Sequence, residues 1–291
     1  MGAIKLAYVE LDSHTKLYYE DHGEGQTVIF VHGVMMSSKF FHKQVPYFSK
    51  NYRVITLDLR AHGKSSKVQY GHTVAQYARD LKCFIEKLDL KDVILVGWSM
   101  GAFVLWDYVN QFGSKNIKAL TVVDQSASDY IWPDWEFGAF DFTILKNVMQ
   151  SIQEDQNKFN SDFIYGMYMD QPDPKEHKWI LKEMNKLPAA IASTIVFNQT
   201  AVDYRDTLCN VDIPTLICFG SHGFFPLAAG EFIQKNIKGS KFVPFYNSSH
   251  LLFLEETDKF NQELDEFFKE VQKSGKVKTK SRKKEKRKAG N

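Results

Sequence analysis

The sequence predicts an α/β protein with a mostly parallel central sheet, helices on both faces and a helical insertion. Short apolar runs rich in Val, Ile and Leu alternate with segments of helical spacing along most of the 291 residues. This alternation is typical of parallel strands joined by helices. It stops between about residues 126 and 210, where several short helical patterns rich in aromatic residues and Met take the place of strands. The interruption predicts that this part is inserted into the sheet domain.

The elements follow one another along the chain as the pattern requires. Two early strands are predicted in "KLAYVEL" and "KLYYEDHG", joined by the turn "DSHT". Buried strands are predicted in "TVIFVHG", "YRVITLDLRAHG", "DVILVGWS", "IKALTVVDQS" and "IPTLICFG", with "KFVPFY" as a further candidate. Helices are predicted over residues 73–88, 100–111 and 230–237, and another begins near Asp258.

These elements predict three parts. Residues 1–126 and 211–272 form the core, residues 127–210 form a helical cap, and residues 273–291 form a basic tail. The tail holds ten Lys or Arg and one acidic residue, which leaves the rest of the chain with 27 basic and 34 acidic residues, a net charge of about −7. Because Val277 is its one branched apolar residue, the tail is predicted to be disordered.

The charge and the cysteines bear on partners and compartment. The tail suits a solubilising end, a nuclear address, or contact with nucleic acid or an anionic membrane, but the acidic body argues against nucleic acid as the main substrate. No apolar run approaches the ~20 residues that span a bilayer, and no secretory signal is visible at the start. Cys83, Cys209 and Cys218 are odd in number and lack metal-like spacing, so reduced thiols are expected. A cytoplasmic location is predicted, with nuclear targeting left open by the tail.

The segment "GWSMG" from Gly97 to Gly101 carries the main chemical signal. It fits G-x-S-x-G between a strand and a helix, where a sharp turn presents the serine at the edge of the sheet. Ser99 is therefore the candidate nucleophile, and Met100 at the start of the helix offers a backbone N–H to an oxyanion. The alternative is a glycine-rich turn without chemistry.

Two further stretches offer partners for Ser99. "FVHGVMMSS" ends a strand at His32, and the loop that follows offers the N–H of Val34 as a second oxyanion donor. "YNSSHLLFLEE" places His250 in a loop after the last strand, where a general base is needed. A third stretch, "DLRAHGKS", follows the strand before the nucleophile, and Asp58 in it is expected to organise the loop around Arg60.

With these motifs the chain resembles the α/β-hydrolases over roughly residues 6–271, most of all the serine esterases and cofactor-free haloperoxidase-like enzymes (perhydrolases). In that branch the nucleophile segment is often G-[FW]-S-M-G. "DLRAHGKS" departs from the usual D-x-R-G-x-G-x-S by Ala61, and Ser249 stands where a glycine usually precedes the histidine. The resemblance implies an α/β-hydrolase fold with a cap, His250 as the general base, and His32 as a structural residue under the oxyanion loop.

The acid of the expected Ser-His-Asp triad is absent from its usual place. Most members carry it after the strand corresponding to "PTLICFG", but "GSHGFFP" puts Gly223 there. A second location known in the superfamily is the end of the strand after the nucleophile helix, where Asp124 stands. Asp124 is therefore the predicted acid and Asp129 the reserve candidate. The alternative for Asp124 is a helix cap at the start of the insertion.

The predicted activity is hydrolysis of a carboxylic ester or related acyl compound through an acyl-enzyme, with no metal and no organic cofactor. The expected substrate is small and apolar, and Trp98, Trp132 and Trp135 are the predicted substrate-binding residues. Thioester, lactone and carbon–carbon bond hydrolysis would use the same groups. Because Gly223 replaces the usual acid, the alternative function is a low-turnover ligand receptor or interaction protein on the same scaffold.

Overall fold

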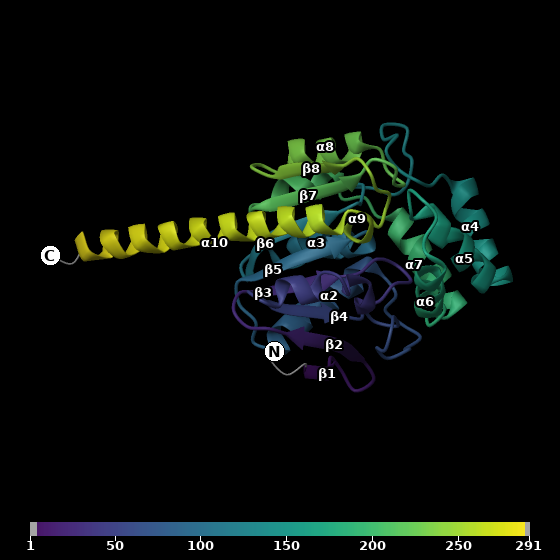
Figure 1. The fold of residues 1–291 in the computed structure, drawn as a ribbon, viewed down its shortest axis with the longest axis horizontal. Coiled ribbons are helices and arrows are strands. Elements are labelled where there is room, and N and C mark those ends of the chain that lie inside the picture. The colour runs from purple at the N-terminus through teal and green to yellow at the C-terminus, as the bar shows by residue number, and fades with distance from the viewer. Residues whose placement is uncertain (1–4, 289–291) are drawn as a thin grey trace.

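The computed structural model describes residues 5–288, and within them one eight-stranded sheet runs in the order β1-β2-β4-β3-β5-β6-β7-β8 (Figure 1). The strands are β1 (Lys5–Glu10), β2 (Lys16–His22), β3 (Thr27–Val31), β4 (Arg53–Leu57), β5 (Val93–Trp98), β6 (Ile117–Val123), β7 (Thr215–Gly220) and β8 (Lys241–Phe245). β2 is antiparallel to both β1 and β4, and the other neighbours are parallel. The predicted mostly parallel sheet is confirmed.

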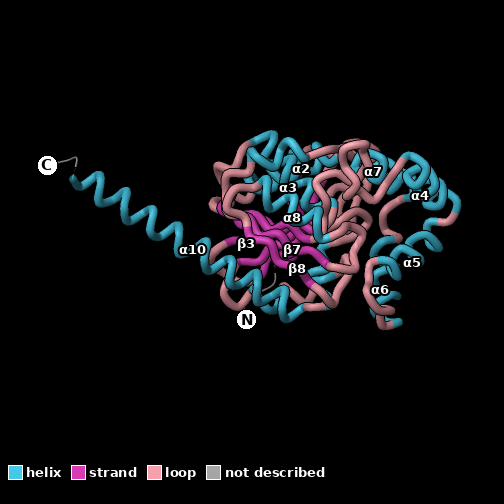
Figure 2. The backbone as a smooth tube through the Cα atoms, turned by 90° about the horizontal axis from the view of Figure 1, so that it is seen from above, coloured by secondary structure: helices cyan, strands magenta, loops and turns pink. Residues whose placement is uncertain are grey.

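The helices lie on both faces of this sheet and at one end of it. They are η1 (Ser38–Phe41), α1 (Val45–Phe48), α2 (Val74–Lys87), α3 (Met100–Phe112), α4 (Phe142–Glu154), α5 (Gln156–Gly166), α6 (Pro174–Met184), α7 (Ala189–Ala201), η2 (Arg205–Asn210), α8 (Leu227–Asn236), α9 (Leu252–Glu255) and α10 (Thr257–Lys288). Figure 2 shows α2, α3 and α8 on one face of the sheet and α10 on the other. The Thr73 side chain caps α2 by accepting from the N–H of Gln76.

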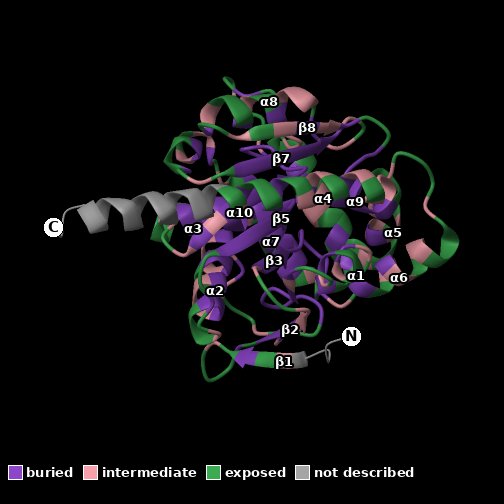
Figure 3. Cartoon of the chain, turned by 60° about the vertical axis from the view of Figure 1, so that its left-hand side comes forward, coloured by how far each residue is buried: buried purple, intermediate pink, exposed green. Residues whose placement is uncertain are grey.

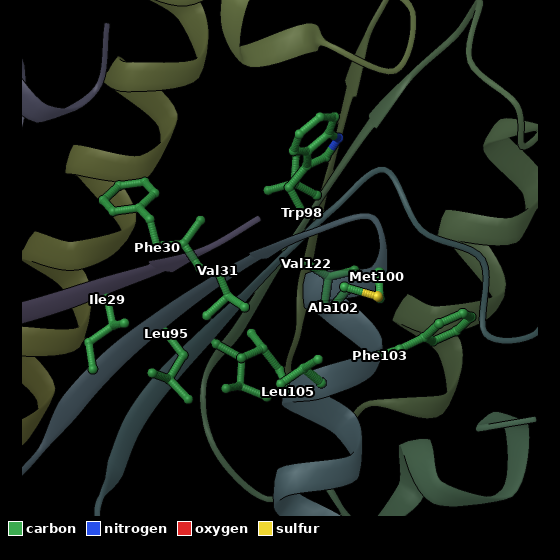
Figure 4. Packing of buried hydrophobic residues seen from close by; sticks show 14 of the residues in the cluster. Ile29, Phe30, Val31, Leu95, Trp98, Met100, Ala102, Phe103, Leu105 and Val122 are labelled. Atoms are coloured by element: carbon green, nitrogen blue, oxygen red, sulfur yellow. The ribbon is translucent and has the colours of Figure 1, made fainter. Parts of the chain in front are cut away.

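The core lies between the sheet and these helices. All residues of β3, β5 and β7 are buried, as the continuous apolar runs predict for central parallel strands (Figure 3). In Figure 4, Val31 and Leu95 of neighbouring strands pack near Ala102 and Leu105 of α3. The turn between β5 and α3 is therefore held in a fully packed environment, which fixes the position of Ser99.

The helices α4 to α7 occupy the stretch where the sequence predicts an insertion, and they lie together at one end of the sheet (Figure 1). The two ends of this stretch meet. Ser128 and Asp203 form an isolated antiparallel bridge, and the N–H of Tyr204 donates to the carbonyl of Ala127 at 2.9 Å. η2, which the prediction also assigns to the cap, contacts α3 and α8 of the sheet domain.

The basic segment differs from its prediction. α10 continues to Lys288, so residues 273–288 are helical where the sequence predicts disorder, and residues 289–291 lie outside the described residues. Lys, Arg and Glu are good helix formers, so a helix that is already anchored can extend through them without burying apolar surface. Among the helices of residues 5–288, none combines the length and the hydropathy that a bilayer crossing requires.

Candidate active site

The turn between β5 and α3 holds Ser99 in a backbone conformation that few residues adopt, with φ 53° and ψ −128°. Two close approaches make this turn possible. A Cβ on Gly97 would lie 2.6 Å from the carbonyl carbon of Gly101, and a Cβ on Gly101 would collide with the carbonyl oxygen of Val31. The glycines are thus required by the tight strand-to-helix turn, as the motif predicts.

Asp124 and His250 meet at the same edge of the sheet, although 126 positions separate them in the chain. His250 Nδ1 lies 2.6 Å from Asp124 Oδ2, and both side chains are buried. The other carboxylate oxygen, Oδ1, accepts the N–H of Gly220 at 2.9 Å. Because an ionised carboxylate only accepts, the proton of the imidazole is assigned to Nδ1, which leaves Nε2 as the proton acceptor.

Gly223 stands beside this pair. A Cβ on Gly223 would lie 2.7 Å from Asp124 Oδ2, so the carboxylate of Asp124 fills the space that a side chain at position 223 would enter. The absence of a side chain at position 223 thus leaves room for the carboxylate of Asp124, the residue that the sequence predicts as the acid.

The loop of His250 is tied to the turn of the nucleophile. Trp98 Nε1 donates to the carbonyl of His250 at 3.0 Å, and the centroids of the Trp98 and His250 rings lie 5.3 Å apart. Ser99 and His250 line one cavity. Among the described residues, no hydrogen bond joins Ser99 Oγ to His250; such bonds often form only when substrate is present.

Two residues of the loop after β3, Val34 and Met35, line this cavity, and one of them has a free backbone N–H. The N–H of Met35 donates to His62 Nε2 at 3.2 Å and that of Met36 to Gly33 O at 3.2 Å. The N–H of Val34 has no partner among the described residues, and Val34 lines the cavity. Met100 is the first residue of α3, so the N–H of Met100 has no acceptor within the helix.

Two buried histidines, His32 and His62, support this loop, and the sequence predicts a structural role for His32. His32 is fully buried, accepts the N–H of Leu59 at 3.0 Å and lies 4.9 Å from the ring of His62. Burial lowers the pKa of both histidines, so both are neutral acceptors at pH 7. His62 was not singled out from the sequence, although its place in "DLRAHGKS" beside Ala61 was the available signal.

The segment "DLRAHGKS" is organised by Asp58, as expected. Its carboxylate accepts the N–H groups of Ser38 and Lys64, each at 2.7 Å. Arg60 turns away to form a buried ion pair with Asp80 at 2.7 Å. Ala61, which replaces the glycine of the family pattern, has φ 65°, a conformation that favours glycine.

The cavity beside Ser99 has a volume of about 230 Å³ and a mostly apolar wall. It is lined by Val34, Met35, Ser99, Gln125, Asp129, Ala139, Phe140, Ile144, Val148, Phe159, Phe163, Val196, Gln199, Thr200, Phe224, Phe225 and His250. The wall therefore combines residues of the sheet domain with residues of α4, α5 and α7. A space of this kind suits a small, largely apolar ligand.

The three tryptophans predicted to bind substrate do not line this cavity. Trp98 is fully buried among the rings of Phe40, His250 and Phe253. The indole nitrogens of Trp132 and Trp135 both donate to Ser128. Aromatic content predicts burial but not direction, and phenylalanines of the cap and of the loop after β7 line the cavity instead.

The reserve candidate for the acid, Asp129, faces the cavity but makes no hydrogen bond to His250. Its carboxylate accepts the side-chain amides of Gln125 at 2.5 Å and Gln199 at 2.6 Å. Burial raises the pKa of Asp129 to about 6. No group of three or more His, Cys, Asp or Glu side chains within residues 5–288 is arranged to hold a metal ion.

Known proteins are similar to this chain in sequence and structure. A family model described as alpha/beta hydrolase fold matches residues 26–144. AB hydrolase superfamily protein YisY of Bacillus subtilis is 28% identical over 265 residues, covering 89% of this chain and 98% of that protein. Bifunctional esterase/perhydrolase DCH of Acinetobacter calcoaceticus is 22% identical over 277 residues, covering 91% of this chain and 100% of its own length.

The solved structures agree with the sequence relatives. The crystal structure of a bromoperoxidase from Bacillus anthracis superposes with a TM-score of 0.88 at 26% identity, covering 91% of this chain and 100% of that one. The chain therefore has the α/β-hydrolase fold and resembles the branch of that superfamily that contains esterases and haloperoxidases, which supports a hydrolase function.

Proposed function

We propose that this protein is a serine hydrolase that cleaves a carboxylic ester or a related acyl compound through an acyl-enzyme. The observation that carries the proposal is the buried hydrogen bond between Asp124 and His250 at the edge of the cavity that contains Ser99. A base oriented by a carboxylate next to a serine on a strained turn is the arrangement that activates a hydroxyl for attack.

The reaction follows from these positions. Asp124 holds the proton of His250 on Nδ1, so that Nε2 takes the proton of Ser99 as Oγ attacks the carbonyl carbon. The N–H groups of Val34 and Met100 stabilise the negative oxygen of the tetrahedral intermediate. His250 then gives the proton to the leaving alcohol, and in the second half it activates a water that releases the acid from Ser99.

The wall of the cavity and the relatives bear on the substrate. The mostly apolar wall supports a small acyl group, and the esterase activity in the name of the Acinetobacter relative supports an ester. The alternative function as a ligand receptor depends on the absence of an acid after β7. Asp124 beside His250 supplies a carboxylate and favours the enzyme.

We also propose the division into a core of residues 1–126 and 211–272 and a cap of residues 127–210. The bridge between Ser128 and Asp203 supports a cap whose two ends leave the core side by side. Residues of α4, α5 and α7 in the wall of the cavity support a role of the cap in choosing the substrate.

A fluorophosphonate probe and a panel of aryl esters of increasing acyl length test the proposed function. We expect the probe to label the wild type rapidly and the panel to show turnover, with both lost in Ser99→Ala. The matched control is Ser13→Ala, which changes an exposed serine in the turn between β1 and β2 and is expected to behave as the wild type. Absence of both labelling and turnover in the folded wild type would reject the proposal.

A further inference from the structure

A polar cluster interrupts the apolar wall of the cavity beside Ser99. Gln125, Asp129, Gln199 and Thr200 all line the cavity, and the exposed fractions of these residues are 0%, 1%, 7% and 1%. Gln125 and Asp129 follow β6, whereas Gln199 and Thr200 lie on α7 of the predicted cap. The cluster therefore joins the sheet domain and the predicted cap in the wall of this cavity.

The hydrogen bonds within the cluster fix the direction of both amides. Gln125 Nε2 donates to Asp129 Oδ1, and Gln199 Nε2 donates to Asp129 Oδ2. The opposite orientation would set an amide oxygen against a carboxylate oxygen, so each Nε2 is assigned to Asp129 and each Oε1 points elsewhere.

Three oxygens of the cluster are left without a partner. These buried atoms, which form no hydrogen bond with any other described residue, are Gln125 Oε1, Gln199 Oε1 and Thr200 Oγ1. A buried polar atom without a partner costs about 1–3 kcal/mol. A purely structural role, fastening α7 to the segment after β6, accounts for the two amide nitrogens and the carboxylate but leaves these three oxygens unexplained.

The charge of the cluster is negative or zero. No Lys or Arg forms an ion pair with Asp129 among residues 5–288, and the groups that act on its carboxylate are the two glutamine amides and His250. Two of the three free oxygens are amide oxygens, which only accept. The hydroxyl of Thr200 can donate as well as accept, but Gln125 Oε1 and Gln199 Oε1 require a hydrogen-bond donor from outside the cluster.

We propose that this cluster recognises a hydrogen-bond donor, a hydroxyl or an amide N–H, on the substrate chain that enters the cavity. The inference rests on the proposed function and narrows it: the substrate is an ester with a donor-bearing chain, rather than a plain alkyl ester. A site built around unpaired acceptors discriminates against an analogue that lacks the donor, because that analogue leaves the acceptors buried and unpaired.

Binding to Ser99→Ala tests this inference without turnover. The ligands are straight-chain esters of increasing length that end in a hydroxyl, in a methyl, or in a methoxy group, with the end group placed on the acyl or on the alcohol chain. Calorimetry is expected to show that a hydroxyl ester binds about tenfold more tightly than its methyl counterpart, the effect of one hydrogen bond. The methoxy ester accepts but does not donate, and it is expected to bind no better than the methyl ester.

Variants of the cluster locate the effect. Adding Gln199→Met, which keeps the length of the side chain and removes the amide, is expected to reduce the preference for the hydroxyl to about threefold or less. Thr200→Val, which keeps the shape, is a second variant in case Gln199→Met fails to fold. The control Val148→Ala removes an apolar part of the wall and is expected to change the affinity for all three ligands while the ratio between them stays the same.

The outcomes separate this inference from the proposed function. Equal binding of hydroxyl and methyl esters, or a preference that survives in every cluster variant, would overturn the inference even if the wild type is an esterase. A preference that falls in the cluster variants would support the recognition of a donor even if the wild type shows no turnover and no labelling of Ser99, in which case the proposed function alone fails.

Discussion

Asp124 and Asp129 are five positions apart, both are buried at the same edge of the sheet, and their surroundings give them different chemistry. The carboxylate of Asp124 is hydrogen-bonded to the imidazole of His250 and to the N–H of Gly220. The carboxylate of Asp129 is hydrogen-bonded to two neutral side-chain amides. The carboxylate beside the histidine suits a permanent negative charge. The other has its pKa raised to about 6 by burial and suits recognition of a donor. Neighbours rather than residue type set the role of a buried carboxylate.

The largest effect expected from this comparison is on catalysis. Asp124→Asn removes the acceptor that orients His250, and kcat/KM is expected to fall by about 10³-fold to 10⁴-fold. Asp129→Asn is the matched control and is expected to stay within about tenfold of the wild type, since its carboxylate does not contact His250. Initial rates on an aryl ester measure both. Full activity in Asp124→Asn, or equal losses in the two variants, would contradict the assignment of the acid.

Moving the acid sharpens the comparison. Asp124→Gly vacates the space beside position 223, so the double variant Asp124→Gly/Gly223→Asp is expected to recover about tenfold to a hundredfold in kcat/KM over Asp124→Gly alone. Gly223→Asp by itself is expected to lower activity, because its Cβ would lie 2.7 Å from Asp124 Oδ2. Asp124→Gly/Gly223→Asn has the same size without the charge. Recovery in that control would mean that space, not a carboxylate, limits the reaction.

The stability of the fold is expected to report on Asp129. Burial raises its pKa from 3.8 to about 6, so the folded protein holds this proton more tightly than the unfolded chain. Its stabilising contribution is complete below the unfolded value and is lost as the pH rises through about 6, a loss on the order of 3 kcal/mol. Between about pH 4 and about pH 7, urea unfolding should show a free energy of unfolding that falls further in the wild type than in Asp129→Asn, by up to about this amount. Equal pH dependence of the free energy of unfolding in the two proteins would count against a raised pKa.

The smallest expected effect concerns the support of His250. Trp98→Phe removes the hydrogen bond from Nε1 to the carbonyl of His250, and kcat/KM is expected to fall about fivefold. Trp132→Phe loses a comparable hydrogen bond, to Ser128, away from the cavity and is expected to leave kcat/KM unchanged. A raised KM in Trp132→Phe would instead support the role in substrate binding that the sequence predicts for Trp132.

Much of the sheet and its edge could be predicted from the sequence. Central strands are apolar on both faces, so their runs are continuous, and "GWSMG" marks a turn that only its glycines permit. Asp124 could be proposed because parallel strands bring their carboxyl ends to one edge and because position 223 lacks a side chain. The role of Gly223 in leaving room for Asp124 could not be predicted, since it depends on a contact between two loops.

The cap was less predictable than the core. Its composition predicts helices, but which face of each helix turns toward the cavity depends on how α4, α5 and α7 pack. For this reason the sequence does not show that Trp132 and Trp135 lie outside the wall of the cavity, nor that Gln199 belongs to a polar cluster in it. The sequence also does not predict the helix over residues 273–288. The prediction of disorder rests on the lack of apolar surface to bury, whereas this helix depends on the helix propensity of the basic residues.

One backbone feature recurs around the edge of the sheet. Met35, Ala61, Ser99 and Asp124 follow β3, β4, β5 and β6 in turn, and each has a φ between 47° and 65°. A residue with a side chain pays about 1–2 kcal/mol for such a backbone. Selection for heat resistance would therefore favour glycine at all four positions. At positions 99 and 124, however, a glycine would lack the hydroxyl and the carboxylate that we assign to the reaction. Ala61→Gly is the substitution by which this protein is expected to gain thermal tolerance without giving up activity.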